Sequence, residues 1–196
     1  MGLQEFKDSQ ESWKLNNPDF EYKLWSDDEN RELIRSSYPF FLSRYDAYRS
    51  PILRADAARI FYLHKYGGVY ADLDVLCLKS IRPLLQNHEL ILGQLTTLSK
   101  PILPFVFHRW EYLHALPNAW MASRPGHLFW MFVAKRMLEA DENLTVEEAT
   151  GPVMIWRSLS EFIKIGGIFW ASVFIADSEL LYPYSWTWPS GETEHS

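Results

Sequence analysis

One segment constrains the fold more than any other: residues 50–78, which read SPILRADAARIFYLHKYGGVYADLDVLCL. Pro51 is typical of a first helical turn, where its missing N–H removes no hydrogen bond. Helix-compatible residues continue to Tyr66, and the pair Gly67-Gly68 predicts a left-handed exit from that helix. Val69, Tyr70 and Val75 favour a strand. The segment therefore predicts a helix, a glycine stop and a strand in direct succession.

Four charged residues in this segment have a spacing that suits chemistry. Asp56 and Arg59 are three residues apart, so they share one face of the predicted helix. Asp72 and Asp74 are two apart in a predicted extended chain, so both carboxylates point the same way. Two adjacent like charges are costly unless a cation or a proton joins them. Mg²⁺ or Mn²⁺ is the natural partner because hard ions prefer oxygen ligands, and such an ion also holds a diphosphate.

Each of these features has an ordinary structural interpretation when it is taken alone. An Asp-x-Asp pair is most often a solvated strand end, an Asp–Arg pair on a helix is often a weak surface ion pair, and two glycines simply stop a helix. A glycoside hydrolase would need two carboxylates about 5–10 Å apart, on either side of the bond. The neighbouring Asp72 and Asp74 suit one metal ion better. The order and spacing of all the features together are much more specific.

The combined pattern resembles the signature of the family 32 glycosyltransferases, the DXD sugar-transferase group. The matching residues are Arg54, Asp56 and Arg59, then Tyr66-Gly67-Gly68-Val69-Tyr70, then Asp72 and Asp74. The resemblance extends from about Trp13 to about Trp186. It implies an α/β, GT-A-like fold, which is Rossmann-like, and a retaining transfer of sugar from a nucleotide donor. It also implies a divalent metal, Mn²⁺ or Mg²⁺, as cofactor.

The resemblance assigns roles to residues inside the signature. Asp72 and Asp74 are expected at the reacting centre as catalytic and metal-binding residues. Asp74 would ligate the metal directly, whereas Asp72 would bind the donor sugar or ribose and reach the metal through water. Asp56 and Arg59 would hold the donor's sugar hydroxyls and diphosphate, for which the arginine fork is suited. Tyr70 is expected to contact the substrate.

Two further blocks resemble family motifs downstream of the signature. Asn118 belongs to an Asn-x-x-x-x-Ser block and is a candidate to hydrogen-bond the donor sugar, although an asparagine after Pro117 is equally typical of a turn. Thr150 and Gly151 precede Pro152 in a Thr-Gly-Pro motif that would line the active cleft. The simpler interpretation of that motif is the start of a helix.

The sequences Ala71-Asp72-Leu73-Asp74-Val75 and Tyr182-Pro183-Tyr184 most resemble the mannosyl-inositol phosphorylceramide synthase branch, beside the α-1,6-mannosyltransferases. That branch implies GDP-mannose as donor, inositol phosphorylceramide or a glycan as acceptor, and a regulatory subunit as partner. Transfer of galactose or another sugar is the alternative. Family members begin with a strand of the form Ile-Pro-Lys-Ile-Ile-His-Gln-Trp, which is expected to be missing here. A catalytically incomplete remnant that binds a partner subunit is therefore the competing hypothesis.

The composition and charge of the chain limit which partners and which cellular compartment we expect. The 196 residues are expected to form one domain, and a net charge of −6 without a basic stripe argues against nucleic acid. Cys77 is the only cysteine, so no internal disulfide can form, and a buried thiol is expected. No segment has the ~18 apolar residues that span a bilayer, and the N-terminus has no signal-peptide core. Residence at the lumenal face of the Golgi membrane follows from the resemblance alone.

The rest of the chain alternates between helical and strand patterns, which predicts the α/β class. We expect strands at residues 20–25, 89–93, 116–123 and 173–176. We expect helices at residues 1–17, 27–36, 39–48, 128–140 and 152–163, with Ser26 or Asp27 and His127 as caps. Pro83 is expected to end the strand that leaves the aspartate pair.

Overall fold

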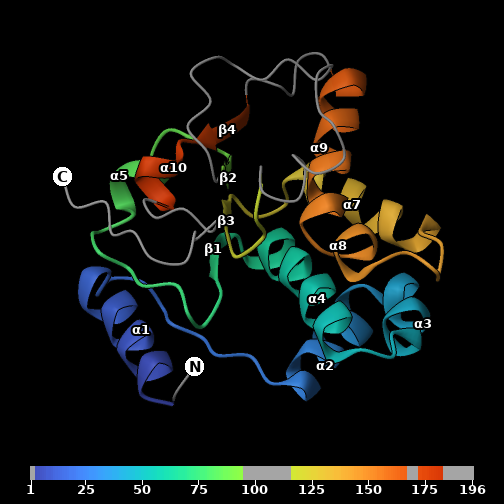
Figure 1. The fold of residues 1–196 in the computed structure, drawn as a ribbon, viewed down its shortest axis with the longest axis horizontal. Helices are drawn as coiled ribbons and strands as arrows, with labels where there is room; N and C mark the ends of the chain where they lie inside the picture. Colours follow the sequence, from blue (N-terminus) through green and yellow to red (C-terminus); the bar gives the residue numbers. More distant parts are fainter. Residues whose placement is uncertain (1–2, 95–115, 167–171, 183–196) are drawn as a thin grey trace, which may run out of the picture.

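The computed structural model describes residues 3–94, 116–166 and 172–182. Along the chain, helices α1 to α4 come first, and strands and helices are interspersed after them (Figure 1). Their bounds are α1 (Leu3–Asn16), α2 (Asp27–Ser37), α3 (Pro39–Ala47), α4 (Pro51–Tyr66), β1 (Gly68–Ala71), α5 (Arg82–Leu85), β2 (Leu90–Gly93), β3 (Trp120–Ser123), α7 (Leu128–Glu139), α8 (Val146–Ala149), α9 (Pro152–Gly166), β4 (Val173–Ala176) and α10 (Ser178–Leu181). In these described ranges, no helix is both long and apolar enough to cross a membrane.

The four strands form one mixed sheet in the order β1-β3-β2-β4. β3 runs antiparallel to both of its neighbours, with Met121 opposite Tyr70 on one side and opposite Leu92 on the other. β4 is parallel to β2. Among the described strands, β1 therefore lies at an edge of the sheet. The mixed sheet and its helices confirm the predicted α/β class.

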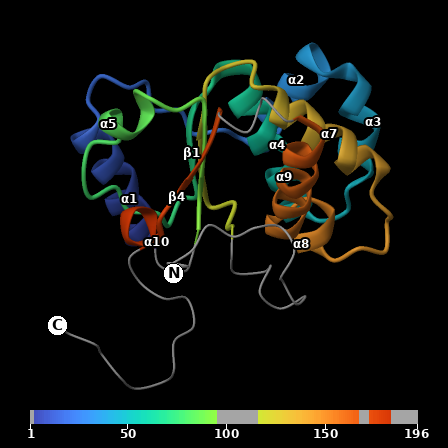
Figure 2. The ribbon, with the colours of Figure 1, turned by 90° about the horizontal axis from the view of Figure 1, so that it is seen from above.

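Helices cover both faces of the sheet, so the molecule has three layers (Figure 2). One face carries Leu90, Leu92 and Met121, which pack in a large apolar cluster with helices α2, α3, α4, α7 and α9. The opposite face carries Ile91 and Trp120, which pack in a smaller cluster near α1 and α5. Alternate residues of a strand point to opposite faces, which is why neighbouring positions of β2 and β3 divide between two cores.

Helix α4 is the central element of the larger core. Ala57, Ala58, Ile60, Phe61 and Leu63 are completely buried on it. The two alanines lack bulky side chains, so the helix can approach its neighbours closely. Burial on most sides also encloses Asp56 and Arg59 of this helix, which must then find partners inside the protein.

The turn from α4 into β1 depends on Gly67. Its N–H bonds the carbonyl of Leu63 at 3.0 Å, and its φ is +65°. The positive φ agrees with the predicted glycine exit, but ψ is −150°, so the chain leaves extended rather than left-handed helical. A Cβ at this position would lie 2.6 Å from Pro125 Cδ and 2.8 Å from the Ser123 carbonyl oxygen. Both backbone angle and space therefore require glycine.

The predicted caps are confirmed at two helices. Ser26 caps α2 in a capping box with Glu29, in which each side chain bonds the other residue's backbone N–H. His127 caps α7 by accepting a hydrogen bond from the Phe129 N–H. Both caps satisfy donors that the first helical turn leaves without partners.

Three local predictions are wrong. Residues 20–25 form no strand, because no described strand pairs with them and an alternating pattern needs a neighbouring strand for its backbone bonds. The strand after Gly68 ends at Ala71, and the chain turns at Asp72–Asp74, where the Val75 N–H bonds the Asp72 carbonyl at 3.1 Å. Pro83 does not end a strand; it lies in the first turn of α5. Pro183 and Tyr184 lie outside the described residues.

Candidate active site

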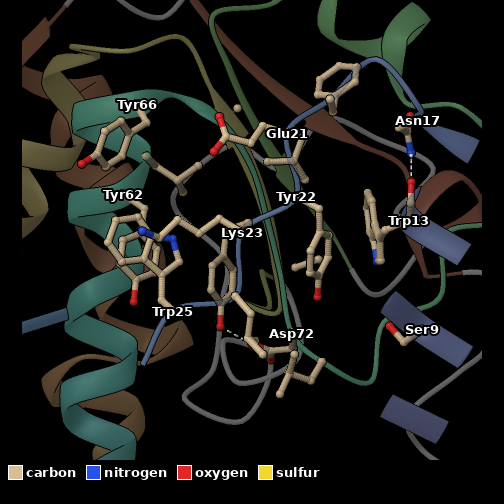
Figure 3. A pocket seen from close by; sticks show the side chains of 18 of the residues that line it. Ser9, Trp13, Asn17, Glu21, Tyr22, Lys23, Trp25, Tyr62, Tyr66 and Asp72 are labelled. Atoms are coloured by element: carbon tan, nitrogen blue, oxygen red, sulfur yellow. Dashed lines mark hydrogen bonds between the residues drawn. The ribbon is translucent and has the colours of Figure 1, made fainter. Parts of the chain in front are cut away.

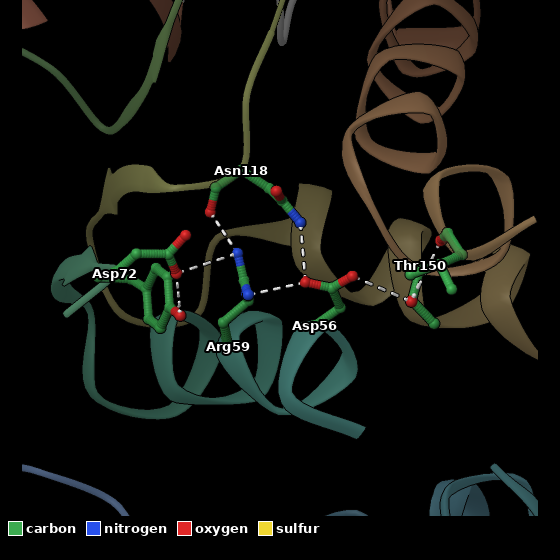
Figure 4. Close-up of polar contacts among 7 residues, drawn as sticks. Asp56, Arg59, Asp72, Asn118 and Thr150 are labelled. Atoms are coloured by element: carbon green, nitrogen blue, oxygen red, sulfur yellow. Dashed lines mark hydrogen bonds and ion pairs between the residues drawn. The ribbon is translucent and has the colours of Figure 1, made fainter. Parts of the chain in front are cut away.

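Residues that are far apart in the sequence meet at the carboxyl end of β1 (Figure 4). Asp56 and Arg59 come from α4, and Tyr70 and Asp72 come from β1 and the turn after it. The remaining members lie just before β3 and between α8 and α9; they are Asn118 and Thr150. The structure therefore gathers six of the eight residues that the sequence singles out into one network of contacts.

A buried ion pair forms the centre of this network. Arg59 Nη2 lies 2.7 Å from Asp56 Oδ1, and both side chains are almost fully enclosed. The predicted i, i+3 spacing on one helix face explains this contact. Removing one partner of such a pair would leave an uncompensated buried charge, which is strongly unfavourable.

Asn118 and Thr150 complete the contacts of Asp56. The Asn118 amide Nδ2 donates to Asp56 Oδ1 at 3.1 Å, and the Thr150 hydroxyl donates to Oδ2 at 3.3 Å. The Asn118 backbone carbonyl also accepts a hydrogen bond from Arg59 Nη1 at 2.6 Å. Both carboxylate oxygens of Asp56 are thus engaged within the protein. The Asp56 carboxylate therefore holds Arg59 in place. Asn118 and Thr150 in turn hold the Asp56 carboxylate.

Arg59 and Tyr70 together fix the carboxylate of Asp72. The Tyr70 hydroxyl donates to Asp72 Oδ1 at 2.5 Å, and Arg59 Nη1 lies 3.5 Å from the same oxygen. The guanidinium also lies over the Tyr70 ring, 4.5 Å from its centroid, in a cation–π contact. No described residue donates a hydrogen bond to Asp72 Oδ2. Within the described residues, one oxygen of this carboxylate is therefore held by two side chains, and the other has no donor.

The site contains more negative than positive charge. Arg59 is the only cation in the network, beside the carboxylates of Asp56, Asp72 and the exposed Asp74. Burial raises the pKa of Asp56 and of Asp72, and the nearby charge of Asp74 raises the pKa of Asp72 further, while Arg59 opposes both shifts. Carboxyl groups with perturbed pKa values in a concave region are typical of functional sites.

The residues present fit a divalent ion that is shared with a substrate. Asp72 has a side chain one third exposed, and Asp74 follows it in the turn. In the described part of the chain, no group of three or more His, Cys, Asp or Glu residues could hold a metal by itself. Mg²⁺ is usually bound by one or two carboxylates together with substrate phosphates and water. Asp72 Oδ2 and Asp74 match that pattern.

Gly151 contributes space rather than a polar group. A Cβ at this position would lie 2.8 Å from the Glu147 Cα, so only glycine lets the chain fold back between α8 and α9. The Gly151 N–H bonds the Val146 carbonyl at 3.0 Å and closes the corner. This corner brings Thr150 against Asp56.

No sequence pattern indicates that α1 and the residue after it hold the segment that follows the aspartate pair. Ser9 Oγ and Trp13 Nε1 both donate to the Val75 carbonyl at 2.7 Å. Asn16 Nδ2 donates to the Cys77 carbonyl at 2.8 Å, and Asn17 Oδ1 accepts from the Ile81 N–H at 3.0 Å. These residues lie about 60 positions upstream, in a polar helix or directly after it, so no local pattern distinguishes them from solvated side chains.

A cavity of about 680 Å³ borders Asp72 on the side of α1 (Figure 3). Residues 20–25, α1, α4 and β1 contribute its walls, which include Tyr22, Trp25 and Tyr62. The rings of Trp25 and Tyr62 stack at 4.6 Å with an interplanar angle of 12°. Its volume lies within the roughly 300–1,000 Å³ that is usual for ligand sites. The cavity offers aromatic surface next to the carboxylates.

Comparison with known proteins agrees with this geometry. Residues 4–91 match the family model described as the glycosyltransferase sugar-binding region containing the DXD motif. Inositol phosphoceramide mannosyltransferase 3 of Schizosaccharomyces pombe is 36% identical over 74% of this chain and 39% of its own length. Mannosyl phosphorylinositol ceramide synthase SUR1 of Saccharomyces cerevisiae is 32% identical over 77% of this chain and 39% of its own length.

Among solved structures, the PaToxG glycosyltransferase aligns with 86% of this chain and 65% of its own, at 14% identity and a TM-score of 0.46. The chain spans about two fifths of the length of the two curated yeast relatives, at 39% of each. The matched region contains the signature that joins Asp56, Arg59, Asp72 and Asp74. The mixed α/β sheet agrees with the GT-A-like fold expected of such proteins. The chain therefore belongs to the family 32 glycosyltransferases, the group with a DXD sugar-binding region.

Proposed function

We propose that this chain is a metal-dependent, retaining glycosyltransferase that moves mannose from GDP-mannose to an inositol phosphorylceramide acceptor. The observation that carries the proposal is the fixed Asp72 carboxylate, which lies two residues before Asp74: Tyr70 and Arg59 hold one of its oxygens, and no described residue donates to the other. The choice of sugar and acceptor rests on relatives whose names specify inositol phosphoceramide and mannosyl transfer. Stated more generally, the proposal is that the chain transfers a sugar from a nucleotide-sugar donor to a glycolipid acceptor.

In this proposal, Asp72 Oδ2 and Asp74 would hold Mn²⁺ or Mg²⁺. The ion would neutralise charge on the nucleoside diphosphate as the glycosidic bond breaks. Arg59 keeps the Asp72 carboxylate in place and adds a permanent positive charge at the end of the site where the diphosphate would lie. Asp56, Asn118 and Thr150 act by keeping Arg59 in that position, as their contacts with it and with one another indicate.

The reaction itself exchanges one bond for another. The bond between the anomeric carbon and the diphosphate oxygen breaks, and its electron pair leaves with the nucleoside diphosphate. The acceptor hydroxyl oxygen bonds the same carbon, and its proton passes to the departing diphosphate oxygen. The protein's main contribution is to position these groups and to stabilise the developing charge on the leaving diphosphate.

The aromatic cavity gives the donor a place to extend away from the carboxylates. A donor whose diphosphate lies at Asp72 can direct its nucleoside toward Tyr22 and Trp25, whose rings line the same cavity. Flat rings and sugar C–H faces both pack well against aromatic side chains. The lumenal face of the Golgi as compartment, and a regulatory subunit as partner, belong to the proposal through the family.

The test is hydrolysis of a panel of nucleotide sugars by the purified chain, with and without Mn²⁺, beside an Asp74→Ala variant. We expect turnover of GDP-mannose that requires the ion and falls by about 100-fold or more in the variant. If the chain preferred another sugar nucleotide, the proposed donor would change, but the chain would still be assigned as a glycosyltransferase. A folded chain that turns over no donor would refute the proposal and favour a partner-binding remnant.

A further inference from the structure

Three aromatic rings from separate parts of the chain stack in one row beside the carboxylates. Trp25 lies on Tyr62, with ring centroids 4.6 Å apart and an interplanar angle of 12° (Figure 3). Tyr62 in turn lies 6.4 Å from Tyr70, centroid to centroid, at an angle of 26°. Both separations fall within the roughly 4.5–7 Å at which aromatic pairs attract each other. Tyr62 is therefore the middle ring of the row.

A cation lies at each end of this row. The Arg59 guanidinium lies over Tyr70, 4.5 Å from the ring centroid. Lys23 Nζ lies over Trp25, 3.9 Å from the ring centroid, and also pairs with Glu29 at 3.0 Å. Cations are attracted to the faces of aromatic rings, so both contacts favour the stacked arrangement. We give the name aromatic column to Lys23, Trp25, Tyr62, Tyr70 and Arg59.

The aromatic column joins the two parts of the candidate active site. At one end, Tyr70 and Arg59 hold the Asp72 carboxylate. At the other end, Trp25 lines the cavity. Tyr62 lies between them on α4, three residues after Arg59, so these two side chains share one face of the helix. A displacement of the Tyr62 ring would therefore remove a packing contact from both parts of the site.

The hydroxyl and the ring of Tyr62 make separate contacts. The hydroxyl donates a hydrogen bond to Oδ1 of Asn30, a buried residue of α2. The ring contacts Trp25 on one side and Tyr70 on the other. Replacement by phenylalanine removes the first contact and keeps the other two. The contribution of the ring can therefore be measured separately from that of the hydroxyl.

We infer that Tyr62 is a positioning residue of the transferase site. Its ring keeps Tyr70 in contact with Asp72, and it keeps Trp25 in the cavity wall where the nucleoside of the donor would lie. The inference rests on the proposed function, because that function places a metal ion at Asp72 and a nucleotide in the cavity. In this role Tyr62 acts through its two neighbouring rings.

The test is calorimetric titration of the full chain, first with Mn²⁺ alone and then with guanosine diphosphate at saturating Mn²⁺. Tyr62→Leu removes the ring, and we expect it to weaken the binding of each ligand by about two- to tenfold, the factor that one aromatic pair supplies. Tyr62→Phe should bind both ligands like the wild type. It should nevertheless be less stable in urea, because the buried Asn30 loses its donor.

Phe61→Leu is the control for a general weakening of the fold. Phe61 is the preceding residue of α4, is fully buried, and packs against Tyr38 and Phe41 rather than against the aromatic column. We expect this variant to lose stability in urea and to keep both binding affinities. That result would distinguish a positioning role of Tyr62 from a contribution to the core alone.

The inference is overturned if Tyr62→Leu keeps the wild-type affinity for either ligand. Equal losses of affinity in Tyr62→Phe or in Phe61→Leu would overturn it as well, and so would a wild type that does not bind both ligands. Donor hydrolysis by the wild type is measured separately. Binding losses as expected, in a chain that hydrolyses no donor, would refute the proposed function alone.

Discussion

The hydroxyl group of Tyr70 gives the sharpest test of how the site is organised. Tyr70→Phe removes the hydroxyl that bonds Asp72 Oδ1 at 2.5 Å and keeps the ring that lies over Arg59. Burial raises the pKa of this hydroxyl, so it stays protonated and acts as a donor at neutral pH. Its loss leaves Arg59, at 3.5 Å, as the one described side chain that still holds the Asp72 carboxylate.

A hydrogen bond to a charged group contributes roughly 1.5–3 kcal/mol. Asp72 is one third exposed, so water replaces part of the lost contact, and about 1–2 kcal/mol is the fair expectation. That energy corresponds to about a 5–30-fold weaker hold on a metal ion at Asp72 and Asp74. The fold should change little in stability, because the ring and its packing remain.

The assay is a Mn²⁺ titration followed by calorimetry and, in parallel, by the Mn²⁺ dependence of donor hydrolysis. The matched control is Tyr66→Phe, which changes a tyrosine at the end of α4 that is 54% exposed. We expect the apparent affinity for Mn²⁺ to fall in the first variant and to stay unchanged in the second. An unchanged Mn²⁺ affinity in Tyr70→Phe, with Asp72→Asn abolishing binding, would show that the hydroxyl does not position the carboxylate.

Two further predictions concern stability. Gly67→Ala places a Cβ 2.6 Å from Pro125 Cδ at a φ of +65°, so urea unfolding should show a loss of about 2 kcal/mol or more, and a loss below about 0.5 kcal/mol would contradict the steric argument. Asp72 has a pKa raised by burial, so the folded state gains stability from its protonation at low pH and loses that gain as the pH rises through the raised value. Asp72→Asn should therefore become more stable relative to the wild type between about pH 4 and pH 7, as urea unfolding at several pH values would show. A constant difference in stability would refute that pKa direction.

Local sequence signals were sufficient to predict the helices whose first and last residues are distinctive. The helix α4 could be predicted from Pro51 at its start and Gly67 at its end, and α2 from the capping residue Ser26. The spacing of Asp56 and Arg59 predicted a shared face because helical geometry alone fixes it. Residues 20–25 were mistaken for a strand, since alternation describes only a side-chain pattern and says nothing of a pairing partner.

Only the tertiary structure decided how the site is assembled. Thr150 meets Asp56 across 94 positions, and Asn118 meets it across 62, contacts that no spacing in the chain can indicate. The turn at Asp72 and Asp74 is also set from outside, by hydrogen bonds from α1 to the residues that follow. The sequence by itself determined which chemical groups are available and placed the aspartates next to each other. Packing decided which of their oxygens remain open, because a buried carboxylate must satisfy its charge with whatever groups the fold brings within reach.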